Sequence, residues 1–124
     1  MRLQHFITSY CYPGQWPRVV SSGYQPVLGI DPDPRVVATV GIHPRVAHLV
    51  DDSDLTRLER RLPCRRVVGL GEVGMDYQMA TYDQTRTQKR LLRKMLPLAV
   101  RYQLPVAIHA RGTKAGADCL KILQ

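Results

Sequence analysis

The stretch VVGLGEVGMDY, residues 67–77, begins as an apolar run and then places one carboxylate, Glu72, among three glycines. An ionised acid beside a buried strand is costly unless a partner, a metal ion or a proton compensates its charge. The partner of Glu72 has to come from elsewhere in the chain. The order of the other elements therefore determines what this acid can do.

The bulk composition is that of one ordinary domain spanning residues 1–124, with 44% hydrophobic residues. No apolar run is long enough to cross a bilayer, and the first residues lack the apolar centre of a signal peptide, so we expect an intracellular protein, cytoplasmic or nuclear, without membrane contact. Three cysteines, an odd number without C-x-x-C spacing, predict reduced thiols rather than disulfides or a cysteine zinc site.

The formal net charge of +8 and the pI near 9.9 indicate attraction to polyanions. The basic residues form two clusters, which fit either solvated helix faces or contacts to phosphates. The first cluster holds Arg57, Arg60, Arg61, Arg65 and Arg66, and the second holds Arg86, Lys89, Arg90, Arg93, Lys94 and Arg101.

Four runs rich in β-branched or aromatic residues predict short strands, the later ones apolar on both faces and therefore buried. They cover residues 3–10, 35–44, 65–72 and 104–112. The segment 21–34 is rich in turn residues, and we expect no helix in it.

Two amphipathic helices are expected between these strands. Residues 51–63 place Leu55, Leu58 and Leu62 on one stripe behind capping acids, and Pro63 ends the helix. Residues 83–103 form the second helix, in which Pro97 predicts a kink or a boundary near Lys94. A third helix begins near the end of the chain.

This order of elements predicts an α/β fold of about four β/α units around a parallel sheet, a partial TIM-type (β/α)8 barrel. The expected strand ends, Cys11, His43, Glu72 and His109, are separated by 32, 29 and 37 residues, which suits one strand, one helix and two loops each. Because parallel strands finish on the same side of a sheet, His43, Glu72 and His109 should converge there.

Imidazole and carboxylate donors in one place suit a divalent ion such as zinc, manganese or magnesium, and a carboxylate can bridge two ions. Two ions can cleave a phosphodiester, with Arg111 contacting phosphate. The alternatives are a Glu72–arginine pair at the sheet edge, a hydrogen-bonded His109, a His43-Pro44 turn without function, and a surface ion pair of Arg111.

A smaller role is expected for the two residues that end the opening stretch. Asp76 is most simply an acid in a turn, and Tyr77 is most simply a packed ring.

Four segments in the same order resemble the TatD family of metal-dependent deoxyribonucleases, within the amidohydrolase-like barrels. They are VGIHPR, GLGEVGMDY, QKRLLRKMLPLA and LPVAIHAR. The resemblance implies a barrel hydrolase that cleaves phosphodiester bonds in DNA with two divalent ions (Mg, Mn or Zn). It also implies that Glu72 bridges the ions, that His109 binds one of them, and that His43 and Arg111 lie near the phosphate.

The chain departs from the family pattern at both ends. The family has a His-x-His pair on its first strand, and FITSYCYPG resembles a degraded copy in which Tyr10 and Tyr12 replace the histidines. Tyr12 precedes His43 by only 31 residues, so we interpret this segment as the second strand and expect the first strand and the C-terminal half to be missing.

On this interpretation the family's catalytic aspartate lies beyond Gln124, and the catalytic residue is unknown in the chain itself. We expect weak metal binding and negligible nuclease activity from these 124 residues alone. Two other hypotheses remain: a non-catalytic basic relic of the fold that binds nucleic acid or protein, and a related amidohydrolase acting on a small substrate.

Overall fold

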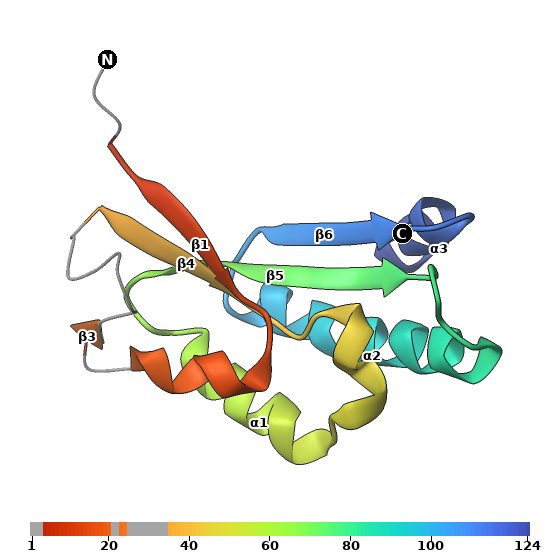
Figure 1. Ribbon diagram of the computed structural model, residues 1–124. Helices are drawn as coiled ribbons and strands as arrows, with labels where there is room; N and C mark the ends of the chain where they lie inside the picture. Colours follow the sequence, from red (N-terminus) through yellow and green to blue (C-terminus); the bar gives the residue numbers. More distant parts are fainter. Residues whose placement is uncertain (1–3, 21–22, 25–34) are drawn as a thin grey trace.

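The computed structural model describes residues 4–20, 23–24 and 35–124. Its centre is a four-stranded parallel sheet in the order β1, β4, β5, β6 (Figure 1). The strands are β1 (Phe6–Tyr10), β4 (Val36–Val40), β5 (Val67–Asp76) and β6 (Val106–Arg111). This sheet confirms the predicted partial barrel of β/α units.

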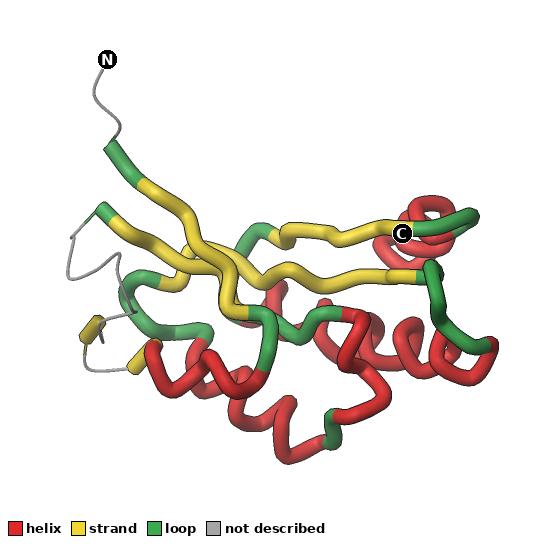
Figure 2. Tube along the Cα trace, viewed as in Figure 1, coloured by secondary structure: helices red, strands yellow, loops and turns green. Residues whose placement is uncertain are grey.

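The helices follow the expected order, with two additional 3-10 helices. The α-helices are α1 (Asp52–Arg61), α2 (Tyr82–Arg101) and α3 (Ala115–Leu123), and the 3-10 helices are η1 (Pro13–Arg18) and η2 (Pro44–Leu49). Figure 2 shows α1 and α2 together on one side of the sheet. A short antiparallel pair, β2 (Val19–Val20) and β3 (Gly23–Tyr24), follows η1. The predicted turn-rich segment 21–34 lies almost entirely outside the described residues.

The core fills the space between the sheet and α1 and α2. Leu58 of α1 and Leu92 of α2 are fully buried against sheet residues such as Val40 and Leu70. The expected capping acids are present, because the Asp51 side chain accepts hydrogen bonds from the backbone N–H groups of Ser53 and Asp54. The apolar stripe and the cap thus determine how α1 meets the sheet.

Trp16 of η1 links the ends of two strands, a feature that the turn residues around it did not predict. Its ring is fully buried, and its Nε1–H donates to the carbonyl oxygens of Tyr10 and Gly41, at 3.2 and 3.3 Å. These carbonyls lie at the carboxyl ends of β1 and β4. The indole therefore holds these strand ends together.

The expected end of β5 at Glu72 is wrong. The strand continues to Asp76 and pairs with β6 over its whole second half. The glycines do not form a turn but allow close contact between strands: a Cβ on Gly74, at φ 142°, would lie 2.1 Å from the carbonyl oxygen of His109. Glu72 is therefore inside the strand.

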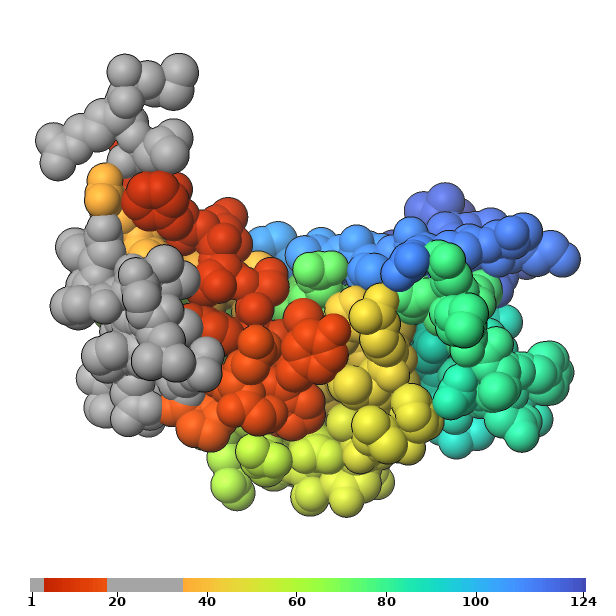
Figure 3. Space-filling view, viewed as in Figure 1, coloured from red at the N-terminus to blue at the C-terminus, as the bar shows by residue number. Residues whose placement is uncertain are grey.

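Two further expectations need correction. Helix α2 is continuous through Pro97, so of the predicted kink or boundary near Lys94 the boundary is wrong. Pro97 is exposed, where water can solvate the carbonyl that loses its hydrogen bond. Strand β6 is exposed along most of its length rather than buried, because it is an edge strand with β5 as its neighbour (Figure 3).

Cys11, Cys64 and Cys119 are all buried free thiols. Within the described residues, none of the helices combines the length and the apolar character that a bilayer crossing requires.

Candidate metal centre

His43, which follows the carboxyl end of β4, meets Glu72 and His109, which lie within the second halves of β5 and β6. Each offers one ligand atom, and these atoms all lie within 4.8 Å of one another. The spacing of the strands along the sequence predicted that these three side chains would lie close together, and the parallel sheet is the reason that they do. It brings together side chains that are 29 and 37 residues apart in the sequence.

A bulge in β5 aims Glu72 at His109. The register between β5 and β6 shifts between Gly71 and Val73, so Glu72 is the extra residue, and such bulges commonly redirect a side chain beside an active site. Its Oε2 lies 3.4 Å from His109 Nδ1. Two ligands bound at ordinary zinc distances to one tetrahedral ion are also about 3.4 Å apart, so this pair fits a metal ion.

His43 differs from His109 in the nitrogen that it leaves free. Its Nδ1 accepts a hydrogen bond from the Arg45 backbone N–H at 3.0 Å, so in the neutral ring Nε2 carries the proton. Burial, and then the neighbouring charge of His109, lower the pKa of His43 and favour that neutral form. His43 therefore presents a donor rather than a lone pair.

The His43 ring is fixed between two other rings. The centroid of the His109 ring lies 4.4 Å from that of His43, with the two planes tilted by 58°. The Tyr12 ring stacks on the His43 ring, with the centroids 5.5 Å apart. Tyr10 is buried in the core, and burial raises the pKa of the Cys11 thiol between the two tyrosines.

Asp76 is the site residue that sequence reasoning missed. It is not a turn acid but the buried last residue of β5, 3% exposed, and its Oδ2 lies 3.0 Å from His109 Nε2. Burial acts to raise the pKa of Asp76, but the hydrogen bond and charge of His109 keep it below the usual value. Tyr77 is a packed ring as expected, and its hydroxyl donates to Asp118.

Two arginines lie beside this cluster. Arg45, from η2, places a guanidinium nitrogen 3.6 Å from Asp76 Oδ2, and Arg111 ends β6 in register with Asp76. Both line a pocket of about 280 Å³ together with His48 and Gln84. The predicted phosphate residue Arg111 is thus close to the predicted metal ligands, and Arg45 adds a second cation.

Acids form ion pairs with part of the two basic clusters, and these pairs do not decide between solvated helix faces and contacts to phosphates. The ion pairs are Lys89–Asp118 at 3.3 Å, Lys94–Asp52 at 3.1 Å, Arg57–Asp54 at 3.1 Å and Arg101–Glu59. Exposed pairs of this kind are worth little stability individually. They do reduce the positive charge that these helices present to a polyanion.

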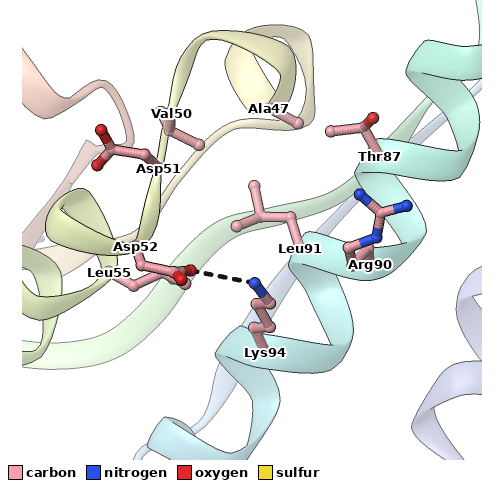
Figure 4. A pocket seen from close by; sticks show the side chains of 9 residues that line it. All are labelled: Ala47, Val50, Asp51, Asp52, Leu55, Thr87, Arg90, Leu91 and Lys94. Carbon is pink, nitrogen blue, oxygen red and sulfur yellow. Dashed lines mark hydrogen bonds and ion pairs between the residues drawn. The ribbon is translucent and has the colours of Figure 1, made fainter.

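A second pocket, of about 240 Å³, lies between η2, α1 and α2, and the Lys94–Asp52 ion pair crosses it (Figure 4). Its acids, Asp51 and Asp52, are engaged by the α1 cap and by Lys94. It contains no histidine or cysteine. We assign no chemistry to it.

In barrels of parallel β/α units, the active site lies at the carboxyl-terminal side of the strands, the side on which His43, Glu72 and His109 gather. Residues 27–124 match the sequence model of the family described as TatD related DNase. The chain therefore belongs to the TatD family.

Individual relatives agree with this assignment. The chain is 34% identical over 96 residues to the uncharacterized metal-dependent hydrolase YjjV of Escherichia coli K12, covering 76% of this chain and 33% of that one. It is 34% identical over 87 residues to the deoxyribonuclease Tat-D of Schizosaccharomyces pombe, covering 62% and 28% of the two chains. The crystal structure of the Escherichia coli YjjV protein matches 97% of this chain with a TM-score of 0.71 and 28% identity, over 45% of that chain.

The chain thus spans about a third of the length of these curated relatives.

Proposed function

We propose that the chain carries part of the active site of a metal-dependent nuclease that cleaves phosphodiester bonds in DNA. In this proposal Glu72 and His109 hold divalent ions, with Glu72 bridging two of them, and His43 and Arg111 contact the phosphate. The observation that carries the proposal is the 3.4 Å approach of His109 Nδ1 to Glu72 Oε2, with Arg45 and Arg111 beside Asp76, the other partner of His109.

The chemistry of the ligand set supports a hard or borderline divalent ion, magnesium, manganese or zinc. Such ions, when bound, supply an activated water and stabilise charge on phosphate oxygens. The Glu72 side chain is 43% exposed, so its second oxygen is accessible for a second ion. Two protein ligands, one of them the bridging Glu72, make a weak site, in keeping with weak metal binding by the chain alone.

In this proposal the phosphate is bound by hydrogen-bond donors of the protein, which are not themselves metal ligands. His43 offers Nε2–H, because its Nδ1 is occupied by the Arg45 backbone N–H. Arg111 is exposed at the end of β6 and can give two parallel hydrogen bonds to a phosphate. Both donors would hold the substrate in place and bind its negative charge.

A small amidohydrolase substrate is the competing hypothesis, since the same ligands serve C–N hydrolysis. Two observations favour nucleic acid: the deoxyribonuclease name of the S. pombe relative and the two cations beside the cluster. The basic relic that binds through its helices is the second alternative, because the ion pairs engage only part of the basic residues on those helices.

The test is the affinity of the 124-residue chain for a short single-stranded DNA with Mn²⁺, measured by fluorescence anisotropy. Arg111→Gln should weaken binding about 10-fold, the cost of one charged hydrogen-bonding group. Arg90→Gln, which removes the same charge from the exposed face of α2, is the matched control and should change affinity less than about 2-fold.

Equal losses in both variants would contradict the proposal and favour binding by the helices. Cleavage is followed in the same samples, and we expect negligible turnover. Robust Mg²⁺- or Mn²⁺-dependent cleavage that disappears in Glu72→Ala would show that the chain is a complete enzyme, against our expectation.

A further inference from the structure

Asp76 is buried at the end of β5 with each carboxylate oxygen engaged. Its Oδ1 accepts the backbone N–H of Gln78 at 3.2 Å, and its Oδ2 faces His109 Nε2 at 3.0 Å, with Arg45 at 3.6 Å. The side chain is 3% exposed, so water cannot replace these partners freely. A carboxylate in this setting has a fixed orientation.

Gln88 of α2 fixes the backbone of the same residue. Its Oε1 accepts the Asp76 N–H at 2.8 Å, and its Nε2 donates to the Asp76 carbonyl at 2.9 Å. Gln88 is 4% exposed and stands among the apolar residues that α2 packs on the sheet. The helix thus holds the strand end that carries the carboxylate.

The Asp76 carboxylate determines which ring nitrogen of His109 carries the proton. An ionised carboxylate only accepts, so His109 must donate its Nε2–H to Asp76. In the neutral ring this leaves the lone pair on Nδ1, the atom that lies 3.4 Å from Glu72 Oε2. Partners of this kind orient metal-binding histidines and fix their tautomer.

We propose that Asp76, held by Gln88, is the positioning residue that keeps His109 in the Nε2–H form with Nδ1 turned toward the metal position beside Glu72. The inference rests on the proposed metal function but makes a separate statement about the metal-free chain. The path runs from α2 through Gln88 and Asp76 to His109 and needs no contact between Asp76 and a metal ion.

The substitution Asp76→Asn tests this path with little change in volume. Because the Gln78 N–H requires an acceptor, the amide oxygen should stay there and the amide NH₂ should face His109. The NH₂ donates to Nε2 and forces the proton onto Nδ1. The tautomer of His109 should therefore switch.

The measurement is a nitrogen-15 NMR experiment on the imidazole of His109 in the metal-free chain at pH 8.5, well above the ordinary histidine pKa of about 6.5. We expect the Nε2–H form in the wild type and the Nδ1–H form in Asp76→Asn. Zn²⁺ affinity, measured on the same samples, should fall about 10- to 100-fold.

Asp118→Asn is the matched control, because Asp118 lies on α3, contacts Tyr77 and Lys89, and has no contact with His109. It should leave the tautomer and the Zn²⁺ affinity unchanged. If Asp76→Asn does not fold, Asp76→Ala removes the acceptor without adding a donor, and should populate both tautomers.

The outcomes separate the two proposals. An unchanged tautomer in the Asp76 variants overturns the positioning role, whatever the metal affinity. A switched tautomer in a chain whose wild type binds no Zn²⁺ supports the positioning role and contradicts the proposed metal function.

Discussion

The pocket between α1 and α2 and the cluster around His109 both contain carboxylates, and they differ in what those carboxylates already contact. In the pocket between α1 and α2, Asp51 caps the helix and Asp52 pairs with Lys94 (Figure 4). At the strand ends, Asp76 orients His109, and Glu72 has a single long contact to the same ring. We therefore expect metal to bind where an acid lies beside an imidazole with an available nitrogen, rather than where acids are most numerous.

The largest expected effect is a loss of metal affinity, which should follow substitution in the cluster around His109 but not in the pocket between α1 and α2. Glu72→Gln should lower Mn²⁺ or Zn²⁺ affinity by about 100-fold or more, because it removes a charged ligand beside His109. The measurement is isothermal titration calorimetry of the 124-residue chain.

Asp52→Asn is the control in the other pocket, since Asp52 is engaged by Lys94. It should leave the metal affinity within about 2-fold of the wild type, because its loss removes no ligand from the strand ends. A comparable loss in both variants would mean that the acids bind metal by charge alone.

A smaller effect should appear in stability at the α1 pocket. Asp51→Ala removes the cap of α1 and should lower the midpoint of thermal unfolding without changing metal affinity. Hydrogen bonds from the Ser53 hydroxyl and the Asp54 N–H lower the pKa of Asp51. A lowered pKa stabilises the fold above the unfolded value of about 3.9, and that stabilisation is lost as pH falls through the folded pKa.

The difference in stability between wild type and Asp51→Ala should therefore be full at pH 7 and shrink below about pH 4. Thermal unfolding followed by circular dichroism between pH 3 and 7 measures it. A difference that grows on acidification would contradict the role of the ionised cap.

The smallest effect is expected for Lys94→Gln, which breaks an exposed ion pair with Asp52. The free energy of unfolding should fall by less than about 1 kcal/mol, as for other exposed pairs. DNA binding should not change either, because Lys94 lies on the helical layer away from the strand ends. A larger loss in urea unfolding would mean that this pocket contributes more to the fold than its contacts indicate.

The sequence predicted the larger features because they follow from general rules. Short β-branched runs about 30 residues apart require parallel strands, and parallel strands finish together, so His43, Glu72 and His109 could be brought together from their spacing alone. The capped apolar stripe of α1 was predictable for the same reason, since it depends on local residues.

The finer features depend on register and hydrogen bonding, which spacing does not determine. Ending β5 at Glu72 was wrong because Gly71 and Gly74 are also compatible with a strand that lies very close to β6. The role of Asp76 follows only once β5 reaches it and His109 is opposite. One signal was present: Gln88, a polar residue on the apolar side of α2, indicated a buried polar partner.

The most direct test of the central claim is where Mn²⁺ binds on the 124-residue chain. Bound Mn²⁺ broadens nearby NMR signals, so a titration followed through backbone amides locates it. The account predicts that Glu72, Asp76 and His109 broaden at lower Mn²⁺ concentration than Asp51, Asp52 and Asp54. Broadening that begins at the α1 acids, or equally at both pockets, would contradict it.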